Sequence, residues 1–368
     1  MIVIADDITG AAEIAGIAFT KGEQVRLVCS SSVGCDNIAA NGTTVVATDT
    51  RSMSEDEAIG ETRRILCIAE CGDANSSPIT HHPSPIFKKT DSALRGHVVA
   101  ELTALMEITG YQRAVYLPAN PSKERIIRDG VYYINQVPIH ETAFSYDPEF
   151  PAKTSVLKER FTDAEAKGII MPDAENEEDI RRIITQYKDG KTIFAGAADL
   201  FSELIDMECE RFKKSIVKHS ISISQSKNST LILCGSTQSK VLNLGIPIAP
   251  MPLEIYDGAE DLILWNTSEY TKTYSLILTM PYTHRTGKDA AVHLRTMMAH
   301  QTKKLVAIHC PEHLIIEGGA TAWATLQELG WTEFTITAQI APGVVQMRAT
   351  NGTLVTLKPG SYPWGGLF

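Results

Sequence analysis

The sequence predicts an α/β protein with two domains, each a mostly parallel sheet flanked by helices. Apolar segments of strand length alternate with helical segments along most of the chain, which is the pattern of repeated βαβ units. The 368 residues are also more than one hydrophobic core usually holds. A polar stretch rich in serine and lysine, residues 213–229, interrupts the alternation. We place the domain boundary there and expect domains at 1–220 and 221–368.

The first domain is expected to alternate strands and helices. Short apolar or β-branched runs predict strands at residues 1–5, 25–29, 43–47, 85–88, 113–117, 131–134, 169–171 and 192–195. Apolar residues at helical spacing predict helices at residues 11–18, 54–70, 98–108 and 177–187. Ser54 and Glu57 form a capping box that marks the start of the second helix. A short hairpin is expected around Pro138, and residues 118–130 are expected to be a loop.

The second domain is expected to repeat this pattern. Its strands are predicted at residues 230–234, 274–279, 313–316, 334–338, 344–347 and 354–357. Apolar residues at helical spacing predict one long helix from about residue 289 to 309, and Pro311 follows its end. A second helix is expected at 322–329, after the glycines of GGAT.

Composition excludes several classes of function. The net charge of −10 comes without a dense cluster of lysine and arginine, so no nucleic-acid partner is expected. No apolar run approaches the roughly 20 residues that span a bilayer, so no membrane partner is expected. The seven cysteines contain no CxxC pair, which argues against a zinc site or a disulfide framework. With reduced thiols and no signal peptide, we expect a cytoplasmic protein; the sequence leaves open whether it forms a homo-oligomer.

The first candidate site lies directly after the first strand. Asp6 and Asp7 are neighbours at its end, and a helical run follows. Carboxylates at the carboxyl end of a parallel strand can accept a hydroxyl proton, hydrogen-bond a polyol or hold Mg²⁺. Asp6 could instead cap the following helix, which is a common use of aspartate before a helix. Phosphatases of the haloacid dehalogenase type place their two aspartates two residues apart, so adjacent aspartates argue against that chemistry.

Two basic segments follow later strands. Arg51, in TDTRS at 48–52, has the fork geometry that binds a carboxylate with two hydrogen bonds. Residues 88–96, KKTDSALRG, combine two lysines, an aspartate, a serine and an arginine between a strand and a helix. Asp91 or Ser92 could cap that helix, whose N-terminus would favour an anion. This density of charge predicts a site for an anionic, hydroxylated ligand.

Glycine turns follow strands of the second domain. Gly235 and Ser236 follow one strand, residues 318–321 (GGAT) follow another, and residues 358–360 follow a third. Glycines at such positions let backbone N–H groups approach a phosphate, and the hydroxyl of Ser236 or Thr321 could donate to it. The sequence contains neither GxxxxGKS/T nor GxGxxG. A nucleotide site here would therefore be of another kind.

Seven motifs occur in a fixed order: ADDITGA at 5–11, TDTRS at 48–52, KKTDSALRG at 88–96, LPANPSKERIIRDG at 117–130, GSTQS at 235–239, EGGAT at 317–321 and LKPG at 357–360. In this order they resemble the four-carbon acid sugar kinase family, formerly a domain of unknown function. The resemblance covers nearly the whole chain. It implies a two-domain enzyme that phosphorylates a tetronate-type acid, such as threonate, erythronate or 3-oxo-tetronate, with ATP and Mg²⁺. The N-terminal domain would bind the acid sugar and the C-terminal domain would bind ATP.

The resemblance also implies site residues. Carried over by motif, the residues at the substrate would be Asp7, Arg51, Lys89, Thr90 and Asp91, and the chemistry of the turns adds Asp6, Ser92 and Arg95. The residues at ATP would be Ser236, Gly318, Gly319, Ala320, Thr321 and Gly360. Arginine and lysine would hold the substrate carboxylate, and Asp7 or Asp91 would orient or deprotonate the attacking hydroxyl. No set of metal ligands is identified.

The chain departs from the family's motifs at three places. It has Ala93 where the family usually has threonine and Ala320 where the family usually has an acidic residue. Proline and bulky rings follow Lys358 in place of a glycine-rich turn. These changes fall mainly on the nucleotide side. Two other functions therefore stay open: a non-catalytic sugar-acid binding protein with a degenerate nucleotide site, and a Mg²⁺-dependent phosphatase.

Overall fold

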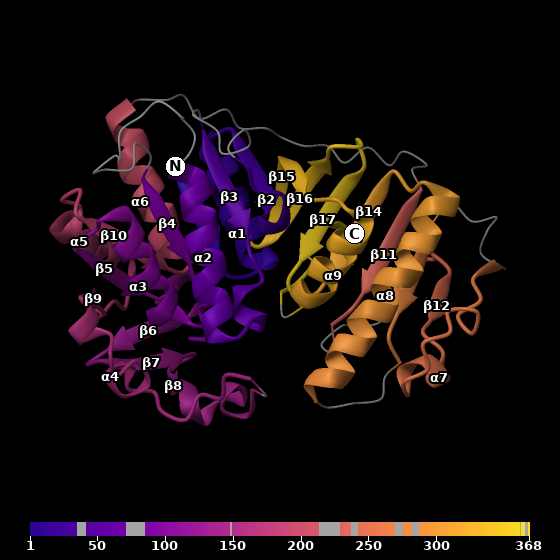
Figure 1. Ribbon diagram of the computed structural model, residues 1–368, viewed down its shortest axis with the longest axis horizontal. Helices are drawn as coiled ribbons and strands as arrows, with labels where there is room; N and C mark the ends of the chain where they lie inside the picture. Colours follow the sequence, from indigo (N-terminus) through magenta and orange to yellow (C-terminus); the bar gives the residue numbers. More distant parts are fainter. Residues whose placement is uncertain are drawn as a thin grey trace. The chain divides into compact units, whose positions relative to one another are not determined.

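The structure is a computed structural model that describes the chain except for residues 35–41, 71–84, 148, 213–228, 237–241, 269–274, 282–286, 361 and 365–366. By its internal contacts the chain divides into two compact units, Met1–Val217 and Lys218–Phe368. The boundary expected near residue 220 falls outside the described residues. Each unit contains a mostly parallel sheet with helices packed on it, so the predicted fold class is confirmed (Figure 1).

The first unit is built on a parallel sheet with the strand order β2-β3-β1-β4-β10-β5-β9. Its strands are β1 (Ile2–Ala5), β2 (Val25–Cys29), β3 (Thr43–Ala47), β4 (Ile86–Lys89), β5 (Arg113–Leu117), β9 (Ile169–Ile170) and β10 (Thr192–Gly196). Its longer helices are α1 (Ile8–Thr20), α2 (Glu55–Glu70), α3 (Val98–Thr109), α5 (Glu177–Tyr187) and α6 (Ala198–Phe212). These bounds agree with the predicted ones to within three residues wherever an element was predicted, and α6 was not predicted.

The topology places the carboxyl end of β1 at a switch point of the sheet. The chain runs from β1 through α1 to β2 on one side, and then from β3 through α2 to β4 on the other side of β1. Because parallel crossovers are right-handed, this reversal puts α1 and α2 on opposite faces of the sheet. Helix α1 packs on α6, and α2 packs on α3. Ligands of open α/β sheets bind at such reversals, outside the carboxyl ends of the strands.

A small antiparallel sheet belongs to the same unit and corrects one prediction. It consists of β6 (Arg125–Arg128), β7 (Val131–Ile134) and β8 (Val137–Pro138). The hairpin near Pro138 is confirmed, but residues 125–128 form a strand and not part of a loop. Asp129 and Gly130 join β6 to β7 with φ of +52° and +73°, the backbone conformation of a tight two-residue hairpin turn. The Asp-Gly pair between apolar residues was the sequence signal for this strand.

The second unit has its own sheet, in the order β12-β13-β11-β14-β17-β16-β15. Strands β11 (Thr230–Cys234), β12 (Ile248–Pro250), β13 (Ser275–Thr279), β14 (His313–Glu317) and β17 (Leu354–Lys358) are parallel, and β15 (Glu333–Ala341) and β16 (Val344–Ala349) are antiparallel. Its helices are α7 (Leu253–Tyr256), α8 (Lys288–His309) and α9 (Gly319–Leu329). The single long helix is confirmed, and α8 packs on α9 in front of the sheet (Figure 1).

Helix α9 begins earlier than predicted. Residues 319–321 were expected to form a loop before a helix at 322–329, but they form its first turn. Gly318, with φ of +97°, is the N-cap residue and has no side chain with which to cap the helix. Within the described part of the chain, no side chain accepts a hydrogen bond from the first backbone N–H groups of α9.

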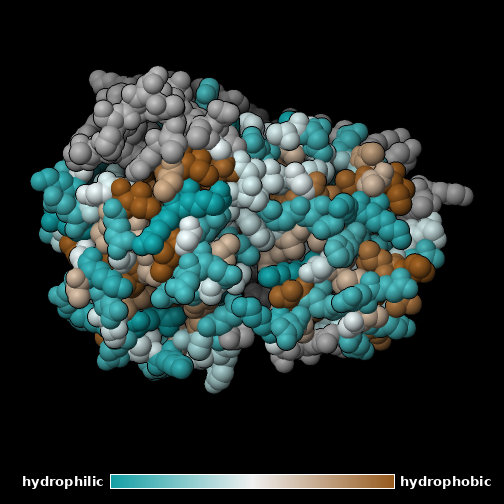
Figure 2. Space-filling model, viewed as in Figure 1, coloured by the Kyte–Doolittle hydropathy of each residue, from teal (hydrophilic) through white to brown (hydrophobic). Residues whose placement is uncertain are grey.

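One face of the surface is drawn in Figure 2. On the face drawn in Figure 2, hydrophilic residues predominate and apolar residues form small separate groups. Among the described residues, no helix combines the length and the apolar character needed to cross a bilayer.

Candidate functional site

Arg51 joins three carboxylates at the carboxyl ends of β1 and β4. Its Nε and Nη2 donate to the two carboxylate oxygens of Asp6 at 3.2 and 2.9 Å. Nη2 also lies 3.2 Å from Oδ1 of Asp7 and 3.7 Å from Oδ1 of Asp91. Strands β3 and β4 flank β1 in parallel register, so the residues that follow these three strands meet at one end of the sheet. Four of the residues expected at the substrate thus lie together.

Asp7, and not Asp6, caps helix α1. The Oδ1 of Asp7 accepts a hydrogen bond from the backbone N–H of Gly10 at 2.8 Å, and Oδ2 accepts one from the Thr9 hydroxyl at 2.5 Å. A Cβ at Gly10 would lie 2.6 Å from Oδ1 of Asp7 and 3.2 Å from Nζ of Lys89, so the site needs a glycine there. The alternative that Asp6 serves only as a helix cap is therefore wrong, because its carboxylate is bonded to Arg51 instead.

Burial and charge separate the three aspartates in acidity. Burial raises the pKa of Asp6, and it does so against the attraction of the Arg51 guanidinium. Burial also acts to raise the pKa of Asp7, but Arg51 and Lys89 outweigh it and lower that pKa. Arg51 and Arg95 likewise outweigh burial and hold the pKa of Asp91 well below its usual range. Asp7 and Asp91 are therefore carboxylates at neutral pH, and as such they can only accept hydrogen bonds.

The turn between β4 and α3 is held by Asp91. Its Oδ2 accepts hydrogen bonds from the backbone N–H groups of Ala93 and Arg95, at 3.0 and 3.3 Å. The side chain of Arg95 returns to the same carboxylate through Nε and Nη2, at 2.8 and 3.0 Å. The sequence suggested that Asp91 or Ser92 caps the following helix, but neither residue does. Helix α3 begins later, with His97 as its N-cap residue and no side-chain cap. The hydrogen bonds of Asp91 therefore stabilise the turn and not the helix.

The two lysines of KKTDSALRG have different surroundings. Lys88 is buried and lies 2.7 Å from the carboxylate of Glu101 in α3, an arrangement that serves packing. Lys89 donates to the carbonyl oxygen of Thr90 at 2.8 Å and lies 3.8 Å from the carboxylate of Glu13, a residue of α1. The hydroxyl of Thr90 is buried and has no hydrogen-bond partner among the described residues. Both lysines thus already have partners within the protein, whereas the Thr90 hydroxyl has none among the described residues.

The segment that contains the small sheet adds residues that the sequence reasoning missed. Nη1 of Arg125 donates to the Ser92 hydroxyl at 2.5 Å. Asp147 lies 3.5 Å from Nη1 of Arg95. The ring of Phe144 has the guanidinium carbons of Arg95 and Arg125 each 5.8 Å from its centroid, which is the range of a cation–π contact. The motif at 117–130 carried Arg125, but nothing in its spacing singled that residue out.

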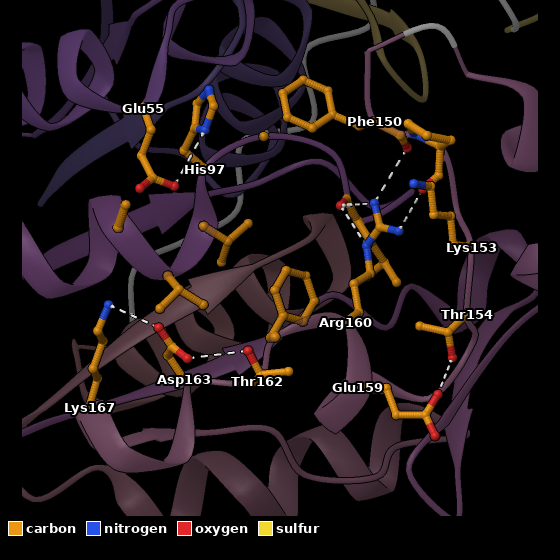
Figure 3. Close-up of a pocket in the computed structure, with 17 residues that line it drawn as sticks. Glu55, His97, Phe150, Lys153, Thr154, Glu159, Arg160, Thr162, Asp163 and Lys167 are labelled. Carbon is orange, nitrogen blue, oxygen red and sulfur yellow. Dashed lines mark hydrogen bonds and ion pairs between the residues drawn. The ribbon is translucent and has the colours of Figure 1, made fainter.

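We call Asp6, Asp7, Arg51, Asp91 and Arg95, with the residues bonded to them, the cluster. A pocket of about 560 Å³ adjoins it (Figure 3). Its wall includes Leu94, Gly96 and His97 from the turn before α3, and none of the residues expected at the substrate lines it. Gly96 links the two, because a Cβ there would lie 3.4 Å from Oδ2 of Asp6. Arg160 lies within the pocket and donates to the carbonyl oxygen of Leu94 through Nε and Nη2, at 3.2 and 2.9 Å. The pocket wall and the cluster thus share one ordered turn.

In the second unit, three turns meet at the carboxyl ends of the adjacent strands β11, β14 and β17. A Cβ at Gly235 would lie 2.1 Å from Oγ1 of Thr321, and a Cβ at Gly360 would lie 2.3 Å from Oγ of Ser236. A side chain at either glycine would therefore clash, and the side chains of Thr321 and Ser236 pack directly against the glycine backbone of the neighbouring turn. All of the residues expected at the nucleotide, Ser236, Gly318, Gly319, Ala320, Thr321 and Gly360, lie on these three turns.

A buried ion pair lies beneath these turns. Nζ of Lys358 is 2.5 Å from Oε1 of Glu317, and both side chains are 2% exposed. The same Nζ donates to the carbonyl oxygens of Pro359 and Gly360, at 3.1 and 3.3 Å, and lies 4.8 Å from the centroid of the Trp364 ring. The ion pair therefore joins the end of β14 to the end of β17 and orders the turn that follows β17.

Two family models match the chain. One, described as a sugar-binding N-terminal domain, covers residues 1–166, and the other, described as a nucleotide-binding C-terminal domain, covers residues 262–362. A 3-oxo-tetronate kinase of Brucella melitensis is 24% identical over 98% of this chain and 92% of its own length. The chain belongs to the four-carbon acid sugar kinase family. The predicted family is therefore confirmed. The predicted class of enzyme, a sugar-acid kinase, is also supported, because the Brucella melitensis relative is named as one.

Other relatives match part of the chain. A D-threonate kinase of Salmonella typhimurium is 31% identical over 43% of this chain and 35% of its own length. A D-erythronate kinase of Heliobacterium modesticaldum is 25% identical over 43% of this chain and 34% of its own length. The matched part is thus about a third of each of these two relatives.

Solved structures share the fold of this family member. A Haemophilus influenzae protein of the DUF1537 family superimposes with a TM-score of 0.67 at 19% identity, over 99% of this chain and 97% of its own. A Salmonella typhimurium LT2 protein, solved under the name of a tRNA synthase, superimposes with a TM-score of 0.75 at 19% identity, over 98% of this chain and 96% of its own. At these identities the likeness shows the fold alone.

Proposed function

We propose that this chain is a kinase that transfers the γ-phosphoryl group of ATP to a hydroxyl of a four-carbon sugar acid. The observation that supports the proposal best is the convergence of Asp6, Asp7 and Asp91 on Arg51 at the switch point of the first sheet. Ionised carboxylates there suit a ligand with several hydroxyl donors. The names of the relatives, threonate, erythronate and 3-oxo-tetronate kinases, support the same class of substrate.

The chemistry proposed for the aspartates follows from their protonation and exposure. Phosphoryl transfer depends mainly on positioning and on neutralising charge, so the acceptor hydroxyl needs an oriented carboxylate more than a strong base. The side chain of Asp7 is 16% exposed, against 11% for Asp91 and 2% for Asp6. Asp7 is therefore the carboxylate that a bound ligand reaches most easily, and we assign it the attacking hydroxyl. Asp91 would bind a second hydroxyl and keep the turn ordered.

The second unit would hold the phosphate donor. The uncapped N-terminus of α9 offers backbone N–H groups to a phosphate, and the positive end of the helix dipole favours that negative charge. Gly235 and Gly360 keep the neighbouring turns close to that helix end, because no side chain fits between them. The hydroxyls of Ser236 and Thr321 lie on the same turns and could donate to a phosphoryl oxygen.

Magnesium would arrive with the nucleotide, as Mg·ATP. In the part of the chain that the structure describes, no group of three or more histidine, cysteine, aspartate or glutamate residues is arranged to hold a metal ion. Magnesium in kinases is commonly held by one or two carboxylates together with the phosphates of the substrate, and it neutralises charge on those phosphates. The proposal therefore treats the ion as part of the nucleotide substrate and not as a resident cofactor.

The direct test is ADP formation with a panel of four-carbon acids. The purified chain is mixed with Mg·ATP and with threonate, erythronate or 3-oxo-tetronate in turn, and ADP is measured by a coupled assay. The proposal predicts ADP formation that requires one of these acids and disappears in Asp7→Asn. Release of phosphate from a sugar-acid phosphate without ATP would favour the phosphatase alternative instead.

A second candidate function is binding of a sugar acid without catalysis. Ala320 favours it, because this residue is exposed in the first turn of α9 and has no polar atom with which to hold a ribose or a metal ion. Thermal unfolding separates the two candidates, since a ligand at 100 times its Kd stabilises the native state by about 2.7 kcal/mol. Stabilisation by a tetronate together with none by Mg·ATP would favour the binding protein.

A further inference from the structure

We propose that Arg125 binds the carboxylate of the sugar acid. Its Nη1 is bonded to the Ser92 hydroxyl at 2.5 Å, while Nε and Nη2 make no hydrogen bond within the described residues. Arg51 and Arg95 each use their Nε–Nη2 edge to bind an aspartate with two hydrogen bonds. Arg125 presents the same edge beside the same turn, but without a carboxylate on it. The assignment rests on the proposed function, because it takes the ligand to be a four-carbon acid.

Two other arginines and three lysines near this turn already have carboxylate partners. Arg51 is within 4.0 Å of three aspartates, and Arg95 is paired with Asp91 and Asp147. The lysines are paired in the same way: Lys88 with Glu101, and both Lys89 and Lys123 with Glu13. Among the described residues, Arg125 and Arg160 have no carboxylate within 4.0 Å, but Nε, Nη1 and Nη2 of Arg160 already donate to backbone carbonyl oxygens. Near this turn, and within the described part of the chain, Arg125 is therefore the arginine whose Nε–Nη2 edge lacks a partner. A substrate carboxylate would give it the partner that the protein does not.

The charge balance points to the same residue. Four carboxylates, those of Asp6, Asp7, Asp91 and Asp147, surround Arg51 and Arg95, so the negative charges exceed the positive ones by one even when Lys89 is counted. A further carboxylate placed on Arg51 or Arg95 would be repelled by the aspartates already there. The same excess of negative charge favours the hydroxyl groups of a sugar acid, which donate hydrogen bonds. The acid end of the ligand therefore belongs at Arg125 and its hydroxyl end at the aspartates.

The backbone and ring contacts of Arg125 fix its place. Its backbone N–H and carbonyl both bond to Asn120, across a turn in which Glu124 has φ of +54°. Its guanidinium carbon lies 5.8 Å from the centre of the Phe144 ring, and its Nη1 holds the Ser92 hydroxyl. The side chain is half-buried, so a ligand can reach it without opening the fold. A preorganised guanidinium of this kind loses little freedom when it binds a carboxylate.

The test compares binding of an acid with binding of its neutral analogue. Isothermal titration without ATP measures the Kd of a four-carbon acid that wild type binds, and of the corresponding four-carbon amide, for wild type and Arg125→Gln. A charge-assisted, two-bond contact predicts at least about a tenfold rise in the Kd of the acid, with the amide changed less than about threefold. Arg128→Gln is the matched control, because Arg128 lies on the same strand but is exposed and paired with Glu175. It should leave both Kd values unchanged.

The outcomes separate this assignment from the proposed function. An Arg125→Gln variant that binds the acid as wild type does, or that loses acid and amide equally, overturns the assignment and leaves a kinase function intact. Acid binding that needs Arg125, in a wild-type chain that forms no ADP from Mg·ATP, supports the assignment and overturns the kinase proposal. Failure of wild type to bind any four-carbon acid overturns both.

Discussion

Replacing Arg51 with methionine should destabilise the first unit strongly, and more so at pH 8 than at pH 5. Arg51 is the shared cation of Asp6, Asp7 and Asp91, whose side chains are 2%, 16% and 11% exposed. Removing one partner from a buried ionic cluster typically costs about 3–5 kcal/mol, because the remaining charges stay desolvated without compensation. We expect Arg51→Met to lower the free energy of unfolding by an amount in this range at pH 8.

The pH dependence follows from the pKa directions. In wild type, Arg51 helps to hold the pKa of Asp7 and Asp91 below the value of an unfolded aspartate, about 3.9, so their contribution to stability is present above that value. Without Arg51, burial and the repulsion between Asp6 and Asp7 should raise the folded-state pKa of both groups above the unfolded value, whereas Arg95 still holds the pKa of Asp91 down. The folded variant then prefers the protonated acids, and its stability falls as the pH rises from about 4 through the raised pKa values. The difference from wild type should therefore shrink at low pH.

The assay must report on the first unit. All four tryptophans, at positions 265, 323, 331 and 364, lie in the second unit, so tryptophan fluorescence does not follow the opening of the first. Amide hydrogen exchange of peptides from β1 and β4, measured by mass spectrometry at pH 5 and pH 8, does follow it once intrinsic exchange rates are taken into account. Arg63→Met is the control, since Arg63 and Glu107 form a pair that is 53% and 56% exposed, worth about 0–1 kcal/mol. A loss below about 1 kcal/mol in Arg51→Met at pH 8, or one that does not change with pH, would refute the reasoning.

Three further predictions concern single side chains. Asp7→Asn keeps a capping oxygen for α1 but removes the charge, so kcat should fall by at least about 100-fold; stability should fall by less than the roughly 3–5 kcal/mol expected of Arg51→Met, because Arg51 keeps Asp6 and Asp91 as partners, and near-normal turnover would exclude the role given to Asp7. Lys358→Met leaves the buried carboxylate of Glu317 without its ion-pair partner and should lower the free energy of unfolding of the second unit by about 3–5 kcal/mol. Urea denaturation followed by tryptophan fluorescence measures this loss, and a loss below about 1 kcal/mol would contradict the prediction. Gly235→Ala puts a Cβ 2.1 Å from a neighbouring side-chain oxygen and should cost about 1–3 kcal/mol, whereas Gly60→Ala, in open space in α2, should stabilise by about 0.5–1 kcal/mol; equal effects would show that close packing at Gly235 is not the cause.

The sequence predicted strand positions well because the strands are continuous apolar runs. Strands β2, β3, β5 and β11 have the predicted bounds, and each is buried on both faces except for single positions. Strand β6 escaped prediction because Ile126 and Ile127 are its only two apolar residues and charged residues flank them. The start of α9 was placed three residues late because glycines are weak helix formers, and here tertiary contacts between the turns override that weakness.

The candidate site was predictable as a set of residue types but not as a set of contacts. Adjacent carboxylates, an arginine and a basic turn after three strands indicated that Asp6, Arg51 and Asp91 would meet. The sequence could not show that the guanidinium of Arg51 would bind Asp6 with two hydrogen bonds. That pairing depends on side-chain positions at the end of β1 and in the segment after β3. It also could not show that Arg125 would reach Ser92, since the two are 33 residues apart and meet only through the small sheet.

Phosphoryl transfer from ATP to a four-carbon acid is the central claim, and phosphorus NMR tests it most directly. The chain is incubated with Mg·ATP and a panel of threonate, erythronate and 3-oxo-tetronate, and the spectrum is followed over time. We expect a new phosphate-monoester signal that grows with ADP in equal amount for at least one acid. We expect neither signal from Asp7→Asn. An acid that binds, while every acid in the panel leaves ATP unchanged, would contradict the claim.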